Sequence, residues 1–124
     1  MALIDTARIA ALAAYSPYSK FRVGAAAIFA ESAEIYTGCN VENASYGLTI
    51  CAERVALCKA ISNHSRQLVK IAIALVGEDG LATKCFMPCG ACLQFMAEFS
   101  TPETEIVVDG IGTYNLRELL PRPF

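Results

Sequence analysis

Cys51-Ala-Glu53 and Pro88-Cys-Gly-Ala-Cys92 together supply three thiols and one carboxylate. Three thiolates fill three of the four positions around a tetrahedral zinc ion and leave the fourth open, which is the arrangement of a catalytic rather than a structural site. Bound zinc lowers the pKa of a coordinated water to about 7, so such a site holds hydroxide at neutral pH. We therefore predict one catalytic Zn²⁺ per chain, bound by Cys51, Cys89 and Cys92.

The first motif is predicted to begin a helix. Residues two apart on a regular helix do not face each other, so Cys51 and Glu53 converge only if Cys51 opens the helix and Glu53 lies in its first turn. Residues 52–61 are rich in good helix formers, and the preceding Gly47 suits a loop or turn. A helix should therefore start near Cys51.

The second motif has the same character. Pro88 precedes Cys89, and the spacing of three between Cys89 and Cys92 places both thiols on one face of a helix that continues through residues 93–99. The partial positive charge at the amino end of each helix favours thiolates. We expect the two helix starts to meet at the metal.

Glu53 is the candidate proton carrier, because releasing an amine as ammonia requires protons at two nitrogens in turn. Dipole matching in a first helical turn is the ordinary explanation of such a Glu. A capping box does not explain it, since Ile50 stands three residues earlier. The C-x-x-C motif alone is equally typical of a thioredoxin-like redox pair, but the third thiol beside Glu53 favours zinc.

The other cysteines and the single histidine fit a metal site less well. Cys58 lies two helical turns beyond Cys51, roughly 10 Å along the axis, and is predicted to be a core residue. Cys39 and Cys85 are predicted to be small buried hydrophobic residues, with Cys85 the one spare thiol that could lie near the metal. His64 follows a predicted helix end, where a capping role is expected.

Composition limits the class of protein. A chain of 124 residues suits one domain, here residues 1–124, and its 55% hydrophobic content with mean hydropathy +0.42 predicts burial in subunit contacts. No apolar run reaches the ~20 residues of a membrane span and no leader is recognisable, so we expect a cytoplasmic protein with no membrane partner. A net charge of −2 without a basic cluster argues against nucleic acid and for a small free substrate.

The remaining chain predicts an α/β layered domain. A helix is expected over residues 3–14, a strand hairpin over 23–29 and 34–37, and further strands over 70–76 and 105–108. A last short helix is expected over 115–120. With the two motif helices, this order implies a three-layer fold with a mixed sheet of about five strands flanked by helices.

Six segments, in order, resemble the cytidine deaminases that act on free nucleosides, and the resemblance covers nearly the whole chain. The metal ligand followed two residues later by Glu, and then P-C-x-x-C, is the signature of zinc-dependent nucleobase deaminases. The segments are Tyr15-Ser-Pro-Tyr-Ser-Lys-Phe21, Val23-Gly-Ala-Ala26, Thr37-Gly-Cys-Asn-Val-Glu-Asn-Ala-Ser-Tyr46, Cys51-Ala-Glu-Arg54, Pro88-Cys-Gly-Ala-Cys92 and Glu118-Leu-Leu-Pro121.

The resemblance implies the cytidine deaminase fold of the three-cysteine, homotetrameric branch with shared active sites. It implies that cytidine and deoxycytidine are hydrolysed to uridine and deoxyuridine for pyrimidine salvage, with hydroxide attacking C4 and Glu53 shuttling protons. Asn40 and Glu42 would hold the ribose 3′-hydroxyl and Phe21 would line the pocket. The other implied contacts are the backbone of Ala52 with the base, and Ala44, Tyr46 and the terminal Phe124 in a neighbouring subunit's site.

Some of these roles also have a physical basis. A carboxylate at Glu42 would repel a phosphate, so nucleosides should be preferred over nucleotides. Three thiolates leave the metal unit at a net charge of −1, and Arg54 could drain charge from Cys51 by hydrogen bonding; alternatively, Arg54 is a surface helix residue. Two positions depart from the family pattern: Leu93 stands where Arg is usual, and Arg22 where a smaller or uncharged residue is common.

Two other functions stay open at this point. A deaminase of the same fold could act on another aminated heterocycle, although Asn40 and Glu42 argue against that. A noncatalytic zinc-binding interaction domain is disfavoured, because a structural zinc would want a fourth protein ligand.

Overall fold

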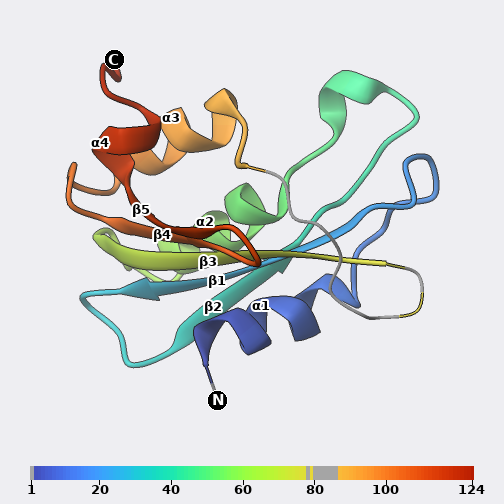
Figure 1. The fold of residues 1–124 in the computed structure, drawn as a ribbon, viewed down its shortest axis with the longest axis horizontal. Helices are drawn as coiled ribbons and strands as arrows, with labels where there is room; N and C mark the ends of the chain where they lie inside the picture. Colours follow the sequence, from blue (N-terminus) through green and yellow to red (C-terminus); the bar gives the residue numbers. More distant parts are fainter. Residues whose placement is uncertain (1, 78, 80–86) are drawn as a thin grey trace.

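The computed structural model of the protein describes residues 2–77, 79 and 87–124. Its centre is a five-stranded sheet in the order β2-β1-β3-β4-β5, with helices on both faces (Figure 1). The strands are β1 (Arg22–Phe29), β2 (Ile35–Cys39), β3 (Leu68–Val76), β4 (Glu105–Val108) and β5 (Gly112–Asn115). The helices are α1 (Leu3–Ala11), α2 (Ala52–Ser62), α3 (Gly90–Glu98) and α4 (Leu116–Leu119), with a 3₁₀ turn at Tyr46–Leu48. The predicted fold class is confirmed.

The sheet is mixed, as expected. β1 pairs antiparallel with both β2 and β3, and the predicted hairpin joins β1 to β2. β3 pairs in parallel with β4, and α3 lies between these two strands in the chain. β5 returns antiparallel to β4 as an edge strand that the sequence pattern did not indicate.

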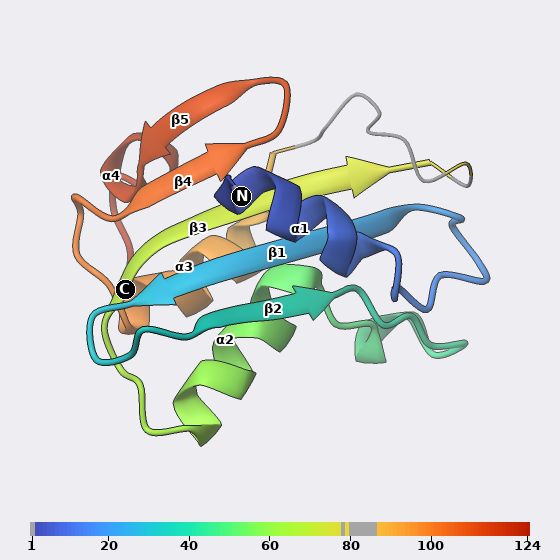
Figure 2. The same cartoon turned by 90° about the horizontal axis from the view of Figure 1, so that it is seen from below.

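Alternation of side chains along the strands divides the core between the two faces. Val23, Ala25 and Ala27 of β1 belong to the larger cluster, which also includes the buried residues of α2 and α3. Ala26, between them, belongs to the smaller cluster with Ala7 of α1. Figure 2 shows α1 alone on its side of the sheet, opposite α2 and α3. Continuous apolar strands such as β1 are typical of a sheet covered on both faces.

α1 packs unusually close to the sheet. A Cβ at Gly24 would lie 1.9 Å from the carbonyl oxygen of Ala7 and 2.5 Å from the nitrogen of Ala11, so only glycine allows this contact. Arg8 adds an ion pair, with Nη2 2.7 Å from Oδ1 of the buried Asp109 at the end of β4. Together these contacts fix α1 across the face opposite α2.

The end of α1 differs from expectation, whereas the cap expected at the end of α2 is present. α1 ends at Ala11 rather than at residue 14, because the next amides donate to carbonyls three residues back before Tyr15 becomes extended. α2 ends at Ser62, and His64, just after the C-cap residue Asn63, has the expected capping role and lies in the left-handed region with φ 69°. Its amide donates to Ile61 O and the amide of Ser65 donates to Ala60 O, which is the Schellman pattern of a helix end.

No helix in the described part of the chain is both long enough and apolar enough to cross a bilayer.

Candidate metal centre and substrate site

The topology of the sheet brings the two predicted helix starts to one edge. β2 and β3 both run antiparallel to β1, so they point in the same direction and end at the same edge. α2 follows β2 and α3 follows β3 in the chain, and both helices lie on the same face (Figure 1). The carboxyl edge of such strands is where open α/β sheets place their sites. Cys51 and Cys89 are the N-cap residues of these two helices.

Gly38 allows the first turn of α2 to lie directly on β2. A Cβ at this position would lie 2.5 Å from both the carbonyl oxygen of Ala52 and the nitrogen of Ala56. Those atoms belong to backbone that cannot move without displacing the helix, so a side chain here would push α2 outward. The position of Cys51 and Glu53 therefore depends on a glycine in the neighbouring strand.

The three predicted ligands come together. The Sγ atoms of Cys51, Cys89 and Cys92 all lie within 4.8 Å of one another, and those of Cys89 and Cys92 are 3.5 Å apart. Two sulfurs bound to one zinc at ~2.3 Å lie about 4 Å apart, so the spacing fits a single ion. Cys92 is buried, Cys51 is half-buried and Cys89 is exposed, which leaves the cluster open on one side.

The charges of the cluster also fit a cation. A hydrogen bond from the Cys92 thiol and the nearby Arg54 guanidinium lower the pKa of Cys51 to about 5, so Cys51 carries a thiolate at neutral pH. The same hydrogen bond and burial raise the pKa of Cys92, because its proton is held between the two sulfurs. A metal ion bound by the three thiols would take the place of that proton and compensate the negative charge.

Glu53 lies in the first turn of α2 and is 1% exposed. Its Oε1 has no hydrogen-bond partner within the described residues, and burial raises the pKa of the carboxyl group to about 7. Burying a carboxylate oxygen without a hydrogen-bond partner is costly. Oε1 of Glu53 is therefore suited to bond a water held by the metal, or the substrate itself. The donor set and this unsatisfied oxygen together fit a catalytic zinc.

Arg54 is not merely a surface residue of α2, because its guanidinium contacts one of the three thiols. Its Nη2 donates to Cys51 Sγ at 3.5 Å, and this contact raises the already high pKa of the guanidinium. Its Nε is buried. Leu93, at the position where the family usually has Arg, is 6% exposed and packs in the larger core cluster, so it provides no charge.

The residues expected to contact a sugar lie at the same edge of the sheet, at the start of β1 and the end of β2. Asn40 is buried, accepts from the amide of Val23 at 2.8 Å and donates to the carbonyl of Phe21 at 2.9 Å. Glu42 is half-buried and accepts from the amides of Tyr18 and Ser19. The pKa of Glu42 is lowered, mainly by the hydrogen bond from the Ser19 hydroxyl.

Ser19 is a residue of this site that the sequence reasoning missed. Its Oγ donates to Glu42 Oε2 and accepts from the amide of Phe21 at 3.0 Å. A Ser that bonds the amide two residues ahead is a recognised turn pattern, and the polar Ser-Pro-Tyr-Ser segment before Phe21 was the available signal. Its long-range contact with Glu42 has no signature in the sequence.

Of the other residues predicted to contact the substrate, one is buried beside the thiols and three have exposed aromatic rings. Ala52 is buried and is the first residue of α2, beside the thiols. Tyr46 is 89% exposed, Phe21 is 62% exposed, and the ring of Phe124 is fully exposed. The amide of Phe124 donates to Gln94 Oε1 on α3 at 3.1 Å. These rings lie on the surface of the chain rather than in its own core.

Two predictions about the other cysteines were wrong. Cys58 is exposed rather than in the core, because it lies on the outer side of α2, away from the buried Leu57. Cys39 is half-buried rather than buried. The prediction for Cys85 falls outside the described residues.

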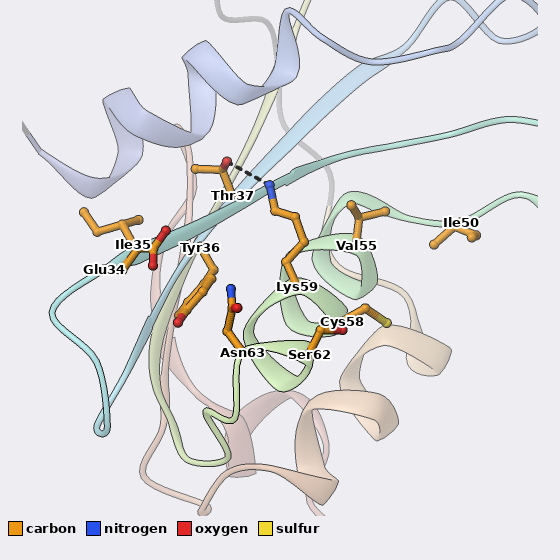
Figure 3. A pocket seen from close by; sticks show the side chains of 10 residues that line it. All are labelled: Glu34, Ile35, Tyr36, Thr37, Ile50, Val55, Cys58, Lys59, Ser62 and Asn63. Atoms are coloured by element: carbon orange, nitrogen blue, oxygen red, sulfur yellow. Dashed lines mark hydrogen bonds between the residues drawn. The ribbon is translucent and has the colours of Figure 1, made fainter.

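Cys58 instead lines a cavity of about 630 Å³ between β2 and the outer face of α2 (Figure 3). Lys59 crosses this cavity and its Nζ donates to Thr37 Oγ1 at 3.4 Å. None of the three clustered thiols nor Glu53 lines it, so it is separate from the metal centre. Its lining residues are Glu34, Ile35, Tyr36, Thr37, Ile50, Val55, Cys58, Lys59, Ser62 and Asn63.

Comparison with known proteins gives a consistent result. A family model described as the cytidine and deoxycytidylate deaminase zinc-binding region matches residues 2–108. A cytidine deaminase from Halalkalibacterium halodurans is 44% identical over 98% of this chain and 91% of its own length. A probable cytidine deaminase from Dictyostelium discoideum is 43% identical over 98% of this chain and 80% of its own length.

Solved structures agree with these relatives. The crystal structure of cytidine deaminase from Mycobacterium tuberculosis has a TM-score of 0.82 and 42% identity, covering 98% of this chain and 94% of that one. Cytidine deaminase from Burkholderia pseudomallei has a TM-score of 0.84 and 38% identity, covering 98% and 96%. The likeness therefore extends over the sheet and both helix starts that hold the thiols.

Proposed function

The chain belongs to the cytidine and deoxycytidylate deaminase family, and we propose that it hydrolyses cytidine and deoxycytidine to uridine and deoxyuridine with release of ammonia. Such a reaction serves pyrimidine salvage. The observation that carries the proposal is the meeting of three thiols at two helix starts, next to a buried carboxylate oxygen that lacks a partner.

Cys51, Cys89 and Cys92 are the residues that would hold the zinc ion. When bound, zinc supplies a water whose pKa is lowered to about 7. The reaction places the oxygen of water on C4 of the base and releases the exocyclic amine. Glu53 moves the protons: its carboxylate takes one from water and delivers it to the ring nitrogen. It then takes the second proton from the hydroxyl on C4 and delivers it to the exocyclic amine, so that the C4–N bond breaks, ammonia leaves and C4 becomes a carbonyl. Burial of Glu53 keeps its pKa near the value that suits both steps.

The substrate contacts are also proposals. Asn40 and Glu42 hold the 3′-hydroxyl of the sugar, Phe21 lines the pocket, and the backbone of Ala52 meets the base. The structure supports this assignment by placing Phe21, Asn40 and Glu42 at the edge of the sheet where the thiols lie. The half-buried carboxylate of Glu42 disfavours a phosphate there, so free nucleosides are the expected substrates.

We further propose that residues 1–124 form one catalytic domain of a homotetramer with shared active sites. Ala44, Tyr46 and Phe124 would then complete a neighbouring subunit's site, which accounts for the exposure of both rings. The cavity between β2 and α2, with the half-exposed Ile35 and Ile50 at its border, offers additional apolar surface for subunit contact. A cytoplasmic location fits a protein that needs reduced thiols as metal ligands.

The experiment is to incubate the purified chain with cytidine and to follow its absorbance together with ammonia release and zinc content. We expect equal amounts of uridine and ammonia, loss of activity when a chelator removes the metal, and recovery when zinc is restored. A zinc-loaded, folded protein that leaves cytidine and deoxycytidine unchanged would contradict the proposal.

A further inference from the structure

The loop of residues 15–21 is hydrogen-bonded to both residues that we propose to bind the sugar, Asn40 and Glu42. Glu42 Oε1 accepts from the amides of Tyr18 and Ser19 at 3.0 and 3.1 Å, and its Oε2 accepts from the Ser19 hydroxyl. Asn40 donates to the carbonyl of Phe21. Glu42, Asn40 and the backbone that carries the Phe21 ring are therefore linked in one hydrogen-bonded unit.

Ser19 Oγ lies at the centre of this unit. It donates its hydrogen to Glu42 Oε2 and accepts the amide hydrogen of Phe21 at 3.0 Å. One hydroxyl thus connects the orientation of the carboxylate with the backbone that carries the Phe21 ring. In the described part of the chain, no other side-chain hydroxyl donates to Glu42.

The geometry of the carboxylate determines what is left for a ligand. A carboxylate offers about four acceptor positions. The loop occupies three in this structure: two on Oε1 through backbone amides and one on Oε2 through Ser19. The remaining position on Oε2 is available to a sugar hydroxyl, and its direction depends on where Ser19 holds this oxygen.

The backbone of the loop indicates that this arrangement is imposed by its surroundings. Lys20 has φ 67°, a left-handed conformation that is unfavourable for a residue other than glycine. Its amide donates to Ser16 O at 3.1 Å, and the bonds of Ser19 and Phe21 hold both neighbours. Such strain persists where the surrounding contacts over-determine it, and ligand clamps are one such place.

We propose that Ser19 is a positioning residue for sugar recognition, which holds Glu42 Oε2 so that its free acceptor position meets the 3′-hydroxyl of a nucleoside and keeps Phe21 in register with it. The proposal rests on the proposed function, because it concerns the same substrate. Ser19 does not itself touch the substrate.

Replacing the serine tests the proposal without removing the loop. In Ser19→Ala the two backbone amides still bond to Glu42 Oε1, so the loop keeps its main attachment. We expect KM for cytidine to rise about 10-fold, as for the loss of a hydrogen bond to a charged group, while kcat changes by less than about 3-fold. Melting temperature and zinc content should match those of the unchanged protein.

A second substrate separates positioning from a general effect on the fold. On 3′-deoxycytidine the hydroxyl that Glu42 would bind is missing, so Ser19→Ala should reduce kcat/KM by less than about 2-fold. Ser19→Thr keeps a hydroxyl and should stay within about 3-fold of the unchanged protein on cytidine. Ser19→Cys has a weaker donor and should fall between Ser19→Thr and Ser19→Ala.

Ser16→Ala is the matched control, because it lies in the same loop and its hydroxyl makes no hydrogen bond within the described part of the chain. It should leave KM for cytidine unchanged. Equal losses on cytidine and 3′-deoxycytidine in Ser19→Ala, or unchanged KM on cytidine, would overturn the proposal. If the unchanged protein deaminates neither nucleoside, the proposed function fails instead, and the two failures are thereby distinguished.

Discussion

The guanidinium of Arg54 donates through Nη2 to the Sγ of Cys51 at 3.5 Å, and its buried Nε has no hydrogen-bond partner among the described residues. The contact joins the first turn of α2 to its own N-cap, so it forms with the helix itself. Three thiolates around Zn²⁺ leave a net charge of −1, which weakens the pull of the metal on water. A cation on one sulfur partly restores that pull.

Arg54→Ala should therefore lower kcat/KM or zinc affinity about 10–100-fold, the usual effect of a group that hydrogen-bonds a metal ligand. Leu93, which is apolar and buried, cannot compensate. Titration with a zinc chelator and steady-state kinetics on cytidine measure the two effects. Arg117→Ala is the control, because this arginine pairs with Glu103 at the surface. Unchanged zinc retention and rate in Arg54→Ala would mean that the contact with Cys51 has no functional consequence.

Glu53→Gln should reduce turnover by at least about 10²–10⁴-fold while zinc content stays at one per chain. Gln is similar in size, but it cannot carry a proton between water and the base, whereas the three thiols are untouched. Glu98→Gln, on an exposed residue at the end of α3, provides the comparison. Near-normal turnover in Glu53→Gln would assign proton transfer to another group.

Much of the metal centre was predictable because its signals are local. Pro88 ahead of Cys89, and the helix formers after Cys51, identified both helix starts, and the structure confirms Cys51 and Cys89 as N-cap residues. The parallel direction of β2 and β3, which brings these helix starts together, depends on strand pairing and could only be inferred from the requirement that the ligands meet.

The errors have physical reasons as well. β5 has only four residues, Gly112–Asn115, and they contain no apolar run. They form a strand because they pair with β4, which the local sequence does not reveal. Cys58 was assigned to the core because it lies too far along α2 from Cys51 to bind the same zinc, but that distance does not show which face of the helix the side chain occupies. The bond between Ser19 and Glu42 joins residues 23 positions apart and leaves no periodic signal.

Metal analysis of single cysteine variants checks the ligand set. Cys51→Ser and Cys92→Ser should lose most of the zinc, because each removes one of three sulfur ligands within 4.8 Å. Cys39→Ser, Cys58→Ser and Cys85→Ser should keep one zinc per chain. Loss of zinc from Cys85→Ser would show that the ligand set is incomplete.

His64→Gly should stabilise the fold by about 1 kcal/mol, because glycine adopts φ 69° without the cost that a side chain carries in the left-handed region. Urea unfolding followed by circular dichroism measures the change. His64→Ala retains a Cβ and should show little gain. Equal stabilisation by both substitutions would point to the imidazole rather than to the backbone as the source of the difference.

The carboxyl end tests the proposed assembly. Gln94, two residues after Cys92 on α3, accepts a hydrogen bond from the amide of Phe124, so the last residue is held near the helix that carries two ligands while its ring is fully exposed. A large exposed ring at an ordered position is typical of a contact surface. In the proposed homotetramer this ring covers a neighbouring subunit's substrate.

Deleting Phe124 should raise KM for cytidine about 5-fold or more, as expected from losing about 1 kcal/mol of contact, with zinc content unchanged. Phe124→Tyr keeps the aromatic ring and should behave like the unchanged protein. Sedimentation at the assay concentration should show a tetramer, and activity should fall on dilution below the concentration at which subunits separate. A fully active monomer, or unchanged kinetics after the deletion, would exclude a shared site and leave the assignment to the deaminase family intact, since that rests on the metal centre and the relatives.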